Sequence, residues 1–127
     1  MANEITKRLG LTASKGPLSL PSTPRTITLD MTGDFGGYNL QALAATTVEA
    51  MAVPTDVTGD FHVMIYNASV TAGDTVQVGY TSGAYSSGNY PFTIKKGDAA
   101  MFTVRSGFTL YLYASAALNV EITTVQV

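Results

Sequence analysis

The chain of 127 residues contains no cysteine and no tryptophan, and it has a single histidine, His62. The lack of cysteine excludes a disulfide framework and a thiolate metal site. One histidine also excludes a metal site built from several histidines. His62 lies in a stretch with strand-like alternation, so we expect it to be a structural or interface residue.

Charged residues are also scarce, at 13% of the chain against the usual quarter. A surface with so little charge relies on Thr, Ser, Gly and Asn, and it leaves apolar area for partner chains to cover. No apolar run approaches the roughly 20 residues of a membrane-spanning helix, so we expect no membrane partner. The chain also lacks a basic start followed by an apolar core, and we expect no signal peptide.

The few charges are unevenly distributed along the chain. Residues 1–25 carry four basic residues and one acid, a net of +3, whereas residues 26–127 carry three basic residues and eight acids, a net of −5. The basic segment would be attracted to an acidic surface, including the body of a neighbouring copy. A nucleic-acid partner would require more arginines interleaved with aromatic residues, so we expect none.

Residues 1–24 form a proline-rich segment that we expect to be an extended N-terminal arm without internal hydrogen bonds. Pro17, Pro21 and Pro24 rule out a long helix and disfavour a central strand. The segment is either a frayed terminus or an arm laid on another subunit. The residues predicted to make its contacts are basic or leucine: Lys7, Arg8, Leu11, Lys15, Leu18 and Leu20.

The middle of the chain has the two-residue apolar period of β-strands. Residues 61–67 and 75–80 alternate around the turn Ala72-Gly73-Asp74, which predicts a central hairpin, and 25–32 alternates most cleanly of all. Residues 38–53 are ambiguous between helix and strand, and we predict two short strands, 38–45 and 47–53.

The second half continues this pattern. Strands are expected at 91–94, 99–104, 108–115 and 118–127, separated by turns such as Lys95-Lys96-Gly97-Asp98. In the last strand the apolar residues change parity after Ile122. This change indicates a bulge near Thr123 and Thr124, or an edge segment with apolar contacts on its outer side.

Eight or nine short strands, with turn signals roughly every ten residues, predict an all-β fold. We predict a single-domain antiparallel β-sandwich over residues 25–127, with a jelly-roll-like arrangement preferred and a barrel as the alternative, preceded by the arm at residues 1–24.

No group of residues suggests catalysis, so we expect no enzyme, no cofactor and no metal site. The aspartates lie at turns and strand ends, where bonding to nearby backbone explains them. Asp56 and Asp60 are near each other, but their loop lacks the carboxylate spacing of a calcium loop.

The loop from Thr81 to Tyr90 is the strongest candidate for a recognition element, because tyrosine gives contact area while Ser, Gly and Asn adapt their hydrogen bonds. A long loop of merely soluble composition is the simpler interpretation. The candidate recognition residues are Tyr80, Tyr85, Asn89 and Tyr90, with a glycan or a protein as the ligand.

Residues 60–127 carry a resemblance to a known family. The pattern consists of Phe61-x-Val63-x-Ile65-Tyr66-Asn67, Asp74-Thr75-Val76-Gln77-Val78-Gly79-Tyr80, Pro91-Phe92-x-Ile94-x-x-Gly97-Asp98-x-Ala100-x-Phe102 and Leu110-Tyr111-x-x-Ala114. It resembles small tailed-phage virion proteins of the capsid-decoration, or cement, type. The arm and residues 38–53 lie outside the resemblance.

The resemblance implies a small β-sandwich that assembles as a homo-oligomer, preferably a trimer, and bridges neighbouring subunits of the major capsid protein. It also implies a place on the capsid surface of a virion after synthesis in the host cytoplasm. A carbohydrate-binding or receptor-binding virion module and a head–tail or tail connector subunit are the alternatives.

Overall fold

The computed structural model describes residues 4–10, 13–15, 17–20, 24–30 and 36–127, and these residues form strands, turns and loops without a helix. The predicted all-β class is therefore confirmed. Contacts divide the chain into two compact units, Met1–Gly33 and Asp34–Val127. The division falls after the predicted boundary at residue 24, because the strand that begins at Arg25 pairs within the first unit.

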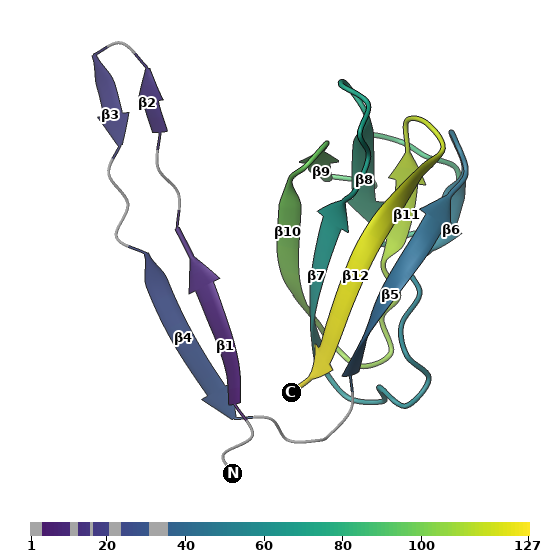
Figure 1. The fold of residues 1–127 in the computed structure, drawn as a ribbon. Helices are drawn as coiled ribbons and strands as arrows, with labels where there is room; N and C mark the ends of the chain where they lie inside the picture. Colours follow the sequence, from purple (N-terminus) through teal and green to yellow (C-terminus); the bar gives the residue numbers. More distant parts are fainter. Residues whose placement is uncertain (1–3, 11–12, 16, 21–23, 31–35) are drawn as a thin grey trace. The chain divides into compact units, whose positions relative to one another are not determined.

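The first unit contains two nested antiparallel pairs, and we call it the N-terminal hairpin (Figure 1). Strand β1 (Glu4–Leu9) pairs with β4 (Arg25–Asp30), and β2 (Ala13–Lys15) pairs with β3 (Leu18–Leu20). Pro17 and Pro24 lie between strands, where a missing N–H group interrupts no ladder. The prediction of an arm without internal hydrogen bonds is therefore wrong for the described residues.

The second unit is a sandwich of two four-stranded antiparallel sheets, with strand orders β10-β7-β12-β5 and β6-β11-β8-β9 (Figure 1). The strands of the sandwich are β5 (Gly36–Leu43), β6 (Val48–Ala50), β7 (Phe61–Asn67), β8 (Thr75–Gly79), β9 (Phe92–Lys95), β10 (Ala99–Val104), β11 (Tyr111–Ala114) and β12 (Leu118–Gln126). The two short strands predicted within residues 38–53 are thus confirmed as β5 and β6.

The pairing of these strands is nested from the outside inwards. Strand β5 pairs with β12, β6 with β11, β7 with β10 and β8 with β9, and the further pairs β12 with β7 and β11 with β8 complete the two sheets. A ribbon of eight strands folded on itself in this order is a jelly roll. The preferred topology is therefore the observed one.

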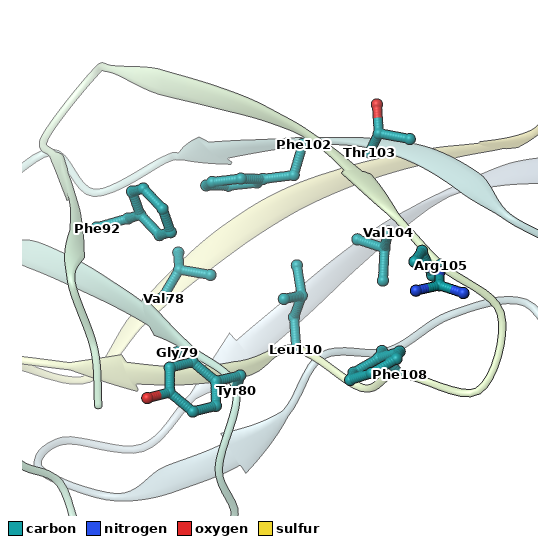
Figure 2. A pocket seen from close by; sticks show the side chains of 10 residues that line it. All are labelled: Val78, Gly79, Tyr80, Phe92, Phe102, Thr103, Val104, Arg105, Phe108 and Leu110. Atoms are coloured by element: carbon teal, nitrogen blue, oxygen red, sulfur yellow. The ribbon is translucent and has the colours of Figure 1, made fainter. Parts of the chain in front are cut away.

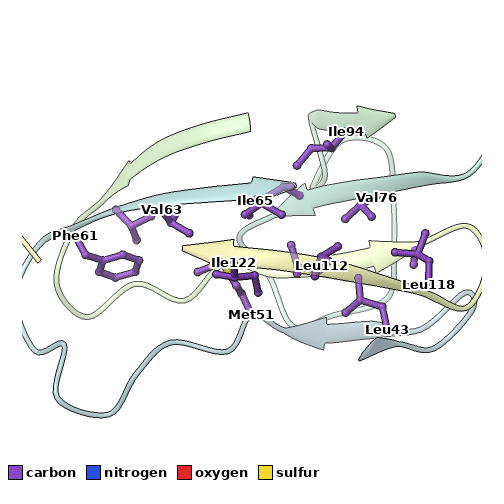
Figure 3. Packing of buried hydrophobic residues seen from close by; sticks show 14 residues of the cluster. Leu43, Met51, Phe61, Val63, Ile65, Val76, Ile94, Leu112, Leu118 and Ile122 are labelled. Atoms are coloured by element: carbon purple, nitrogen blue, oxygen red, sulfur yellow. The ribbon is translucent and has the colours of Figure 1, made fainter. Parts of the chain in front are cut away.

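The core lies between the two sheets and is filled by aliphatic residues with one phenylalanine and one methionine (Figure 3). On β7, Phe61, Val63 and Ile65 are buried, as the alternation predicts, and Val76 and Val78 of β8 meet them from the opposite sheet. Strand β7 lies between β10 and β12 in its sheet.

The predicted central hairpin is wrong, because β7 and β8 lie in different sheets. The connection between them is fixed by Asn67, which is fully buried. Its side-chain amide donates to the carbonyl oxygen of Ile94 at 3.1 Å, and its Oδ1 atom accepts from the backbone N–H of Ser69 at 3.0 Å. A buried amide satisfied by β9 of the other sheet and by the connecting loop can hold the chain where it crosses between the sheets.

Strand β12 runs without the predicted bulge, since its register with β5 is continuous from Leu118 to Val125. Thr124 therefore stays on the core side with Val120 and Ile122, and it is 1% exposed. Val125 lies opposite Gly36 and His62 on the outer side of the sheet. The other interpretation, an edge segment, is also wrong, because β12 pairs with β5 on one side and with β7 on the other.

Candidate functional site

The sandwich is open along one edge, where β9 and β10 end their respective sheets. Phe102 of β10 lies opposite buried Val63, and Phe92 of β9 lies opposite buried Val78, so both rings are on the core side. Phe92 nevertheless remains 53% exposed, and Phe102 is half-buried. The two ring centroids are 5.1 Å apart. The open edge thus exposes aromatic side chains that alternation assigns to the core.

A cavity of about 390 Å³ continues from these two rings, and we call it the aromatic cleft. Figure 2 shows Phe92 and Phe102 towards one end and Phe108 with Arg105 at the other. Apolar and aromatic side chains dominate its walls, and they include Tyr80, Phe92, Phe102, Val104, Phe108 and Leu110. Tyr80 and Phe108 are 63% and 64% exposed. The size and the lining are those of a ligand-binding pocket.

Basic residues flank β10 at both ends. Lys95 and Lys96 lie at the turn before it, and Arg105 follows its last residue directly. These are all the basic residues in the sequence from 36 to 127. Asp98, in the same turn, uses its Oδ1 atom to accept the backbone N–H of Ala99 at 2.8 Å. Acids lie near both ends as well, because Asp74 accepts the backbone N–H of Lys96 through its carbonyl oxygen and Asp60 accepts that of Ser106, while Arg105 lines the cleft itself.

A second apolar surface lies on the outer side of the sheet β10-β7-β12-β5. Met101 lies opposite Met64, Met64 opposite Thr123, and Thr123 opposite Tyr38, which places these residues in one row across the sheet. Leu40 lies two residues further along β5, on the same side. We call Tyr38, Leu40, Met64 and Met101 the outer apolar face; their exposed fractions are 63%, 54%, 39% and 37%.

The four residues of the candidate recognition loop do not form one surface. Tyr90 is buried, and its hydroxyl donates to the carbonyl oxygen of Thr81 at 2.7 Å. Tyr85 stacks on Tyr113 with ring centroids 3.9 Å apart, and Tyr80 lines the aromatic cleft. The backbone N–H of Asn89 donates to the carbonyl oxygen of Ser86 at 3.0 Å. Tyr85 and Tyr90 therefore pack the loop against β11, and Tyr80 alone contributes to the cleft.

The predicted contact residues of the arm belong to the N-terminal hairpin. Lys7 and Arg8 are in β1, Lys15 is in β2, and Leu18 and Leu20 are in β3. Leu11 lies outside the described residues. Arg8 is exposed and Lys7 is half-buried, and burial lowers the pKa of Lys7. Leu9 and Ile27, which the sequence did not single out, are 50% and 42% exposed.

Residues 36–127 and the described parts of the hairpin contain no group of three His, Asp or Glu side chains able to hold a metal ion. His62 is buried, and its Nδ1 atom lies 2.9 Å from the hydroxyl oxygen of Thr103. Asp60 accepts the backbone N–H of Ser106 at 2.7 Å, which gives this acid a structural role. Over the described part of the chain, no helix is long and apolar enough to cross a membrane.

The comparisons with known proteins add no relative. Neither a scan against models of protein families nor a search of curated proteins finds a match to this chain. The candidate site therefore depends on geometry alone.

Sequence reasoning missed the aromatic cleft. The available signal was the placement of Phe92 and Phe102 at alternating positions with Ile94 and Val104, which assigns them to the core side. Their exposure depends on which strands end the sheets, and a single sequence does not state this.

Proposed function

We propose that the chain is a non-enzymatic structural protein of a tailed-phage virion, which decorates the capsid and cements it by bridging neighbouring major capsid protein subunits. The observation that carries this proposal is the outer apolar face. Four large apolar side chains are exposed together on a sheet whose other side is already the core. Contiguous exposed apolar surface of this kind marks sites of protein association.

The outer apolar face is assigned to a neighbouring copy of the same chain, in a homotrimer. Its row across the sheet, from Met101 to Tyr38, contains no charged residue, and Glu121 lies beside this row, opposite Leu40. Copies that meet along the row therefore bring uncharged side chains together. Aromatic residues and methionine are enriched in such interfaces.

The N-terminal hairpin is assigned to the capsid. By sequence, residues 1–33 carry four basic and two acidic residues, a net of +2, whereas residues 34–127 carry three basic and seven acidic residues, a net of −4. An isolated two-stranded hairpin is marginally stable in water, so exposed Leu9 and Ile27 would gain from a partner surface. Attachment through this hairpin leaves the sandwich to make the contacts between copies.

The test of function uses particles with and without the protein. A ligand that binds only the assembled shell stabilises it by RT ln(1 + [L]/Kd), about 2.7 kcal/mol per site at a hundredfold excess over Kd. We expect added protein to raise the temperature at which particles rupture. Deletion of residues 1–33 should remove this effect, and added salt should weaken it because exposed charges are screened within about 8–10 Å.

A matched pair of variants tests the outer apolar face. Leu40→Lys should turn trimers into species of about the 13.3 kDa monomer mass in light scattering, whereas Val70→Lys, at a loop residue that is 86% exposed, should leave them intact.

An unchanged rupture temperature of the particles on addition of the protein would refute capsid cementing. If glycans also bound through Tyr85, the proposed function would become that of a receptor-binding module. Binding of the protein to isolated tails would instead favour a connector subunit.

A further inference from the structure

Strand β10 has a free edge beside the aromatic cleft. Among the described residues it pairs with β7 alone, because it is the last strand of its sheet. Its six residues span about 20 Å at the usual rise of about 3.3 Å per residue. A free edge of this length offers backbone N–H and C=O groups to an incoming extended chain.

We propose that this edge and the aromatic cleft together bind an extended, acidic segment of a partner protein that carries large apolar side chains. The segment adds to the sheet beside β10. This mode of binding takes affinity from the backbone hydrogen bonds of the added strand and specificity from pockets that receive its alternate side chains.

The cleft supplies such a pocket. Phe102 projects from β10 towards it, on the core side of the sheet, while Thr103 projects the opposite way (Figure 2). Alternate side chains of a strand laid against β10 would therefore point the same way as Phe102 and meet Phe92 and Phe108. Exposed aromatic residues next to an arginine are the residue types that dominate binding energy at protein interfaces.

Charge selects the acidic partner. Residues 92–110 carry three basic residues and one acid, a net of +2, and Arg105 is the charged residue among the described residues that line the cleft. Of the five acids in the rest of residues 36–127, Asp60 and Asp74 lie beside this segment. Lys95 and Lys96 stand before β10 and Arg105 after it, so a strand along this edge would have a basic residue near each end. The chain's own N-terminal hairpin, with a net of +2 over residues 1–33, is the wrong sign for this site.

The mostly apolar lining favours a peptide over a nucleic acid, since Arg105 is the only charged residue in the lining of the cleft. The site also differs from the outer apolar face, whose exposed residues lie on the other side of the same sheet. The proposal therefore does not depend on a role in a capsid.

The experiment uses the full chain and a fluorescent nine-residue peptide that alternates leucine with aspartate. We expect saturable binding by fluorescence polarisation, and slower hydrogen exchange at backbone amides of β10. A peptide with lysine in place of aspartate should bind at least fivefold more weakly. Rising salt should weaken binding of the aspartate peptide and narrow its advantage over the lysine peptide, because exposed charges are screened.

Two substitutions at exposed residues test the site without opening the core. Arg105→Gln and Phe108→Thr should each weaken binding about fivefold or more, the effect expected of an energetically important interface residue. Val70→Thr, at an exposed loop residue outside the cleft, should leave binding unchanged. Thermal unfolding of each variant confirms that it is folded.

Four results would overturn the proposal. They are no binding of the aspartate peptide at millimolar concentration, equal binding of the lysine peptide, unchanged exchange in β10, or unchanged binding in both cleft variants. Oligothymidine or a fatty acid that bound in the cleft while the peptide did not would show that the partner class is wrong.

Discussion

The side-chain amide of Asn67 donates to the backbone carbonyl of Ile94, so one buried hydrogen bond of 3.1 Å links the end of β7 in one sheet to β9 in the other. Asn67→Ala would leave this carbonyl and the N–H of Ser69 without that partner. We expect the free energy of unfolding to fall by about 1–3 kcal/mol. Urea denaturation measures the change, and Asn119→Ala, at an exposed asparagine of β12, is the control expected within about 0.5 kcal/mol of the parent.

Gly79, the last residue of β8, lies in close contact with the loop from Thr81 to Tyr90, which we call the tyrosine loop. A Cβ atom there would clash with the carbonyl oxygen of Asn89 and come within 2.6 Å of the Tyr90 ring. Gly79→Ala should therefore destabilise the fold by about 1–3 kcal/mol, because the loop must move. Thermal denaturation measures this effect. Gly88→Ala, where a Cβ meets nothing within 4 Å, should be nearly neutral, and equal losses in both variants would contradict the explanation.

Thr124 is a polar residue among the core residues of β12, and its hydroxyl has no hydrogen-bond partner among the described residues. Thr124→Val keeps the shape and removes this buried hydroxyl. We expect the free energy of unfolding to rise by about 1 kcal/mol, the lower end of the cost of an unsatisfied buried polar group. Chemical denaturation tests this, with Thr71→Val in an exposed loop as the control; a loss of stability would mean that the hydroxyl is satisfied by water.

The phenol of Tyr90 should make stability depend on pH in the alkaline range. Burial raises the pKa of Tyr90 above its ordinary value of 10.0, with a smaller contribution from Tyr111. Above that ordinary value the unfolded chain loses its proton first, so the stability due to this group is present below it and falls as pH rises through the folded pKa. Tyr90→Phe should be less stable at neutral pH, since the bond to Thr81 is lost, but should lose less stability between pH 9 and 11. Parallel slopes in that range would refute the assignment.

The alternation of apolar residues is enough to predict the strands of the sandwich and one face of the core, because Phe61, Val63 and Ile65 must share a side whatever their partners are, but it did not predict β1, β2 and β3. It was not enough to predict pairing. The turn chemistry around Gly73 is compatible with a hairpin, whereas the strand pairing places β7 and β8 in different sheets, and the hydrogen bond from Asn67 to Ile94 links those sheets.

The tyrosine loop shows a second limit of sequence reasoning. Composition alone suggested recognition by Tyr85 and Tyr90, yet stacking on Tyr113 and the hydrogen bond to Thr81 use these side chains to fix the loop. The exposed aromatic residues arise instead where edge strands leave core-side positions such as Phe92 uncovered. Which strands lie at an edge is a property of the whole topology, and local sequence does not encode it.

The nested strand pairing also determines when the sandwich can be completed during synthesis. Strand β5 is the first strand of the sandwich to be made, but the strand it pairs with, β12, is made last, and β7 also needs β12 on one of its sides. Contacts between residues so distant in sequence raise the contact order and slow folding. While the ribosome adds the remaining strands, β5 stays unpaired, and Leu43, which the finished core buries, stays exposed. The nascent chain is therefore most prone to aggregation before residues 118–126 emerge, whereas the N-terminal hairpin has all its strands by residue 30.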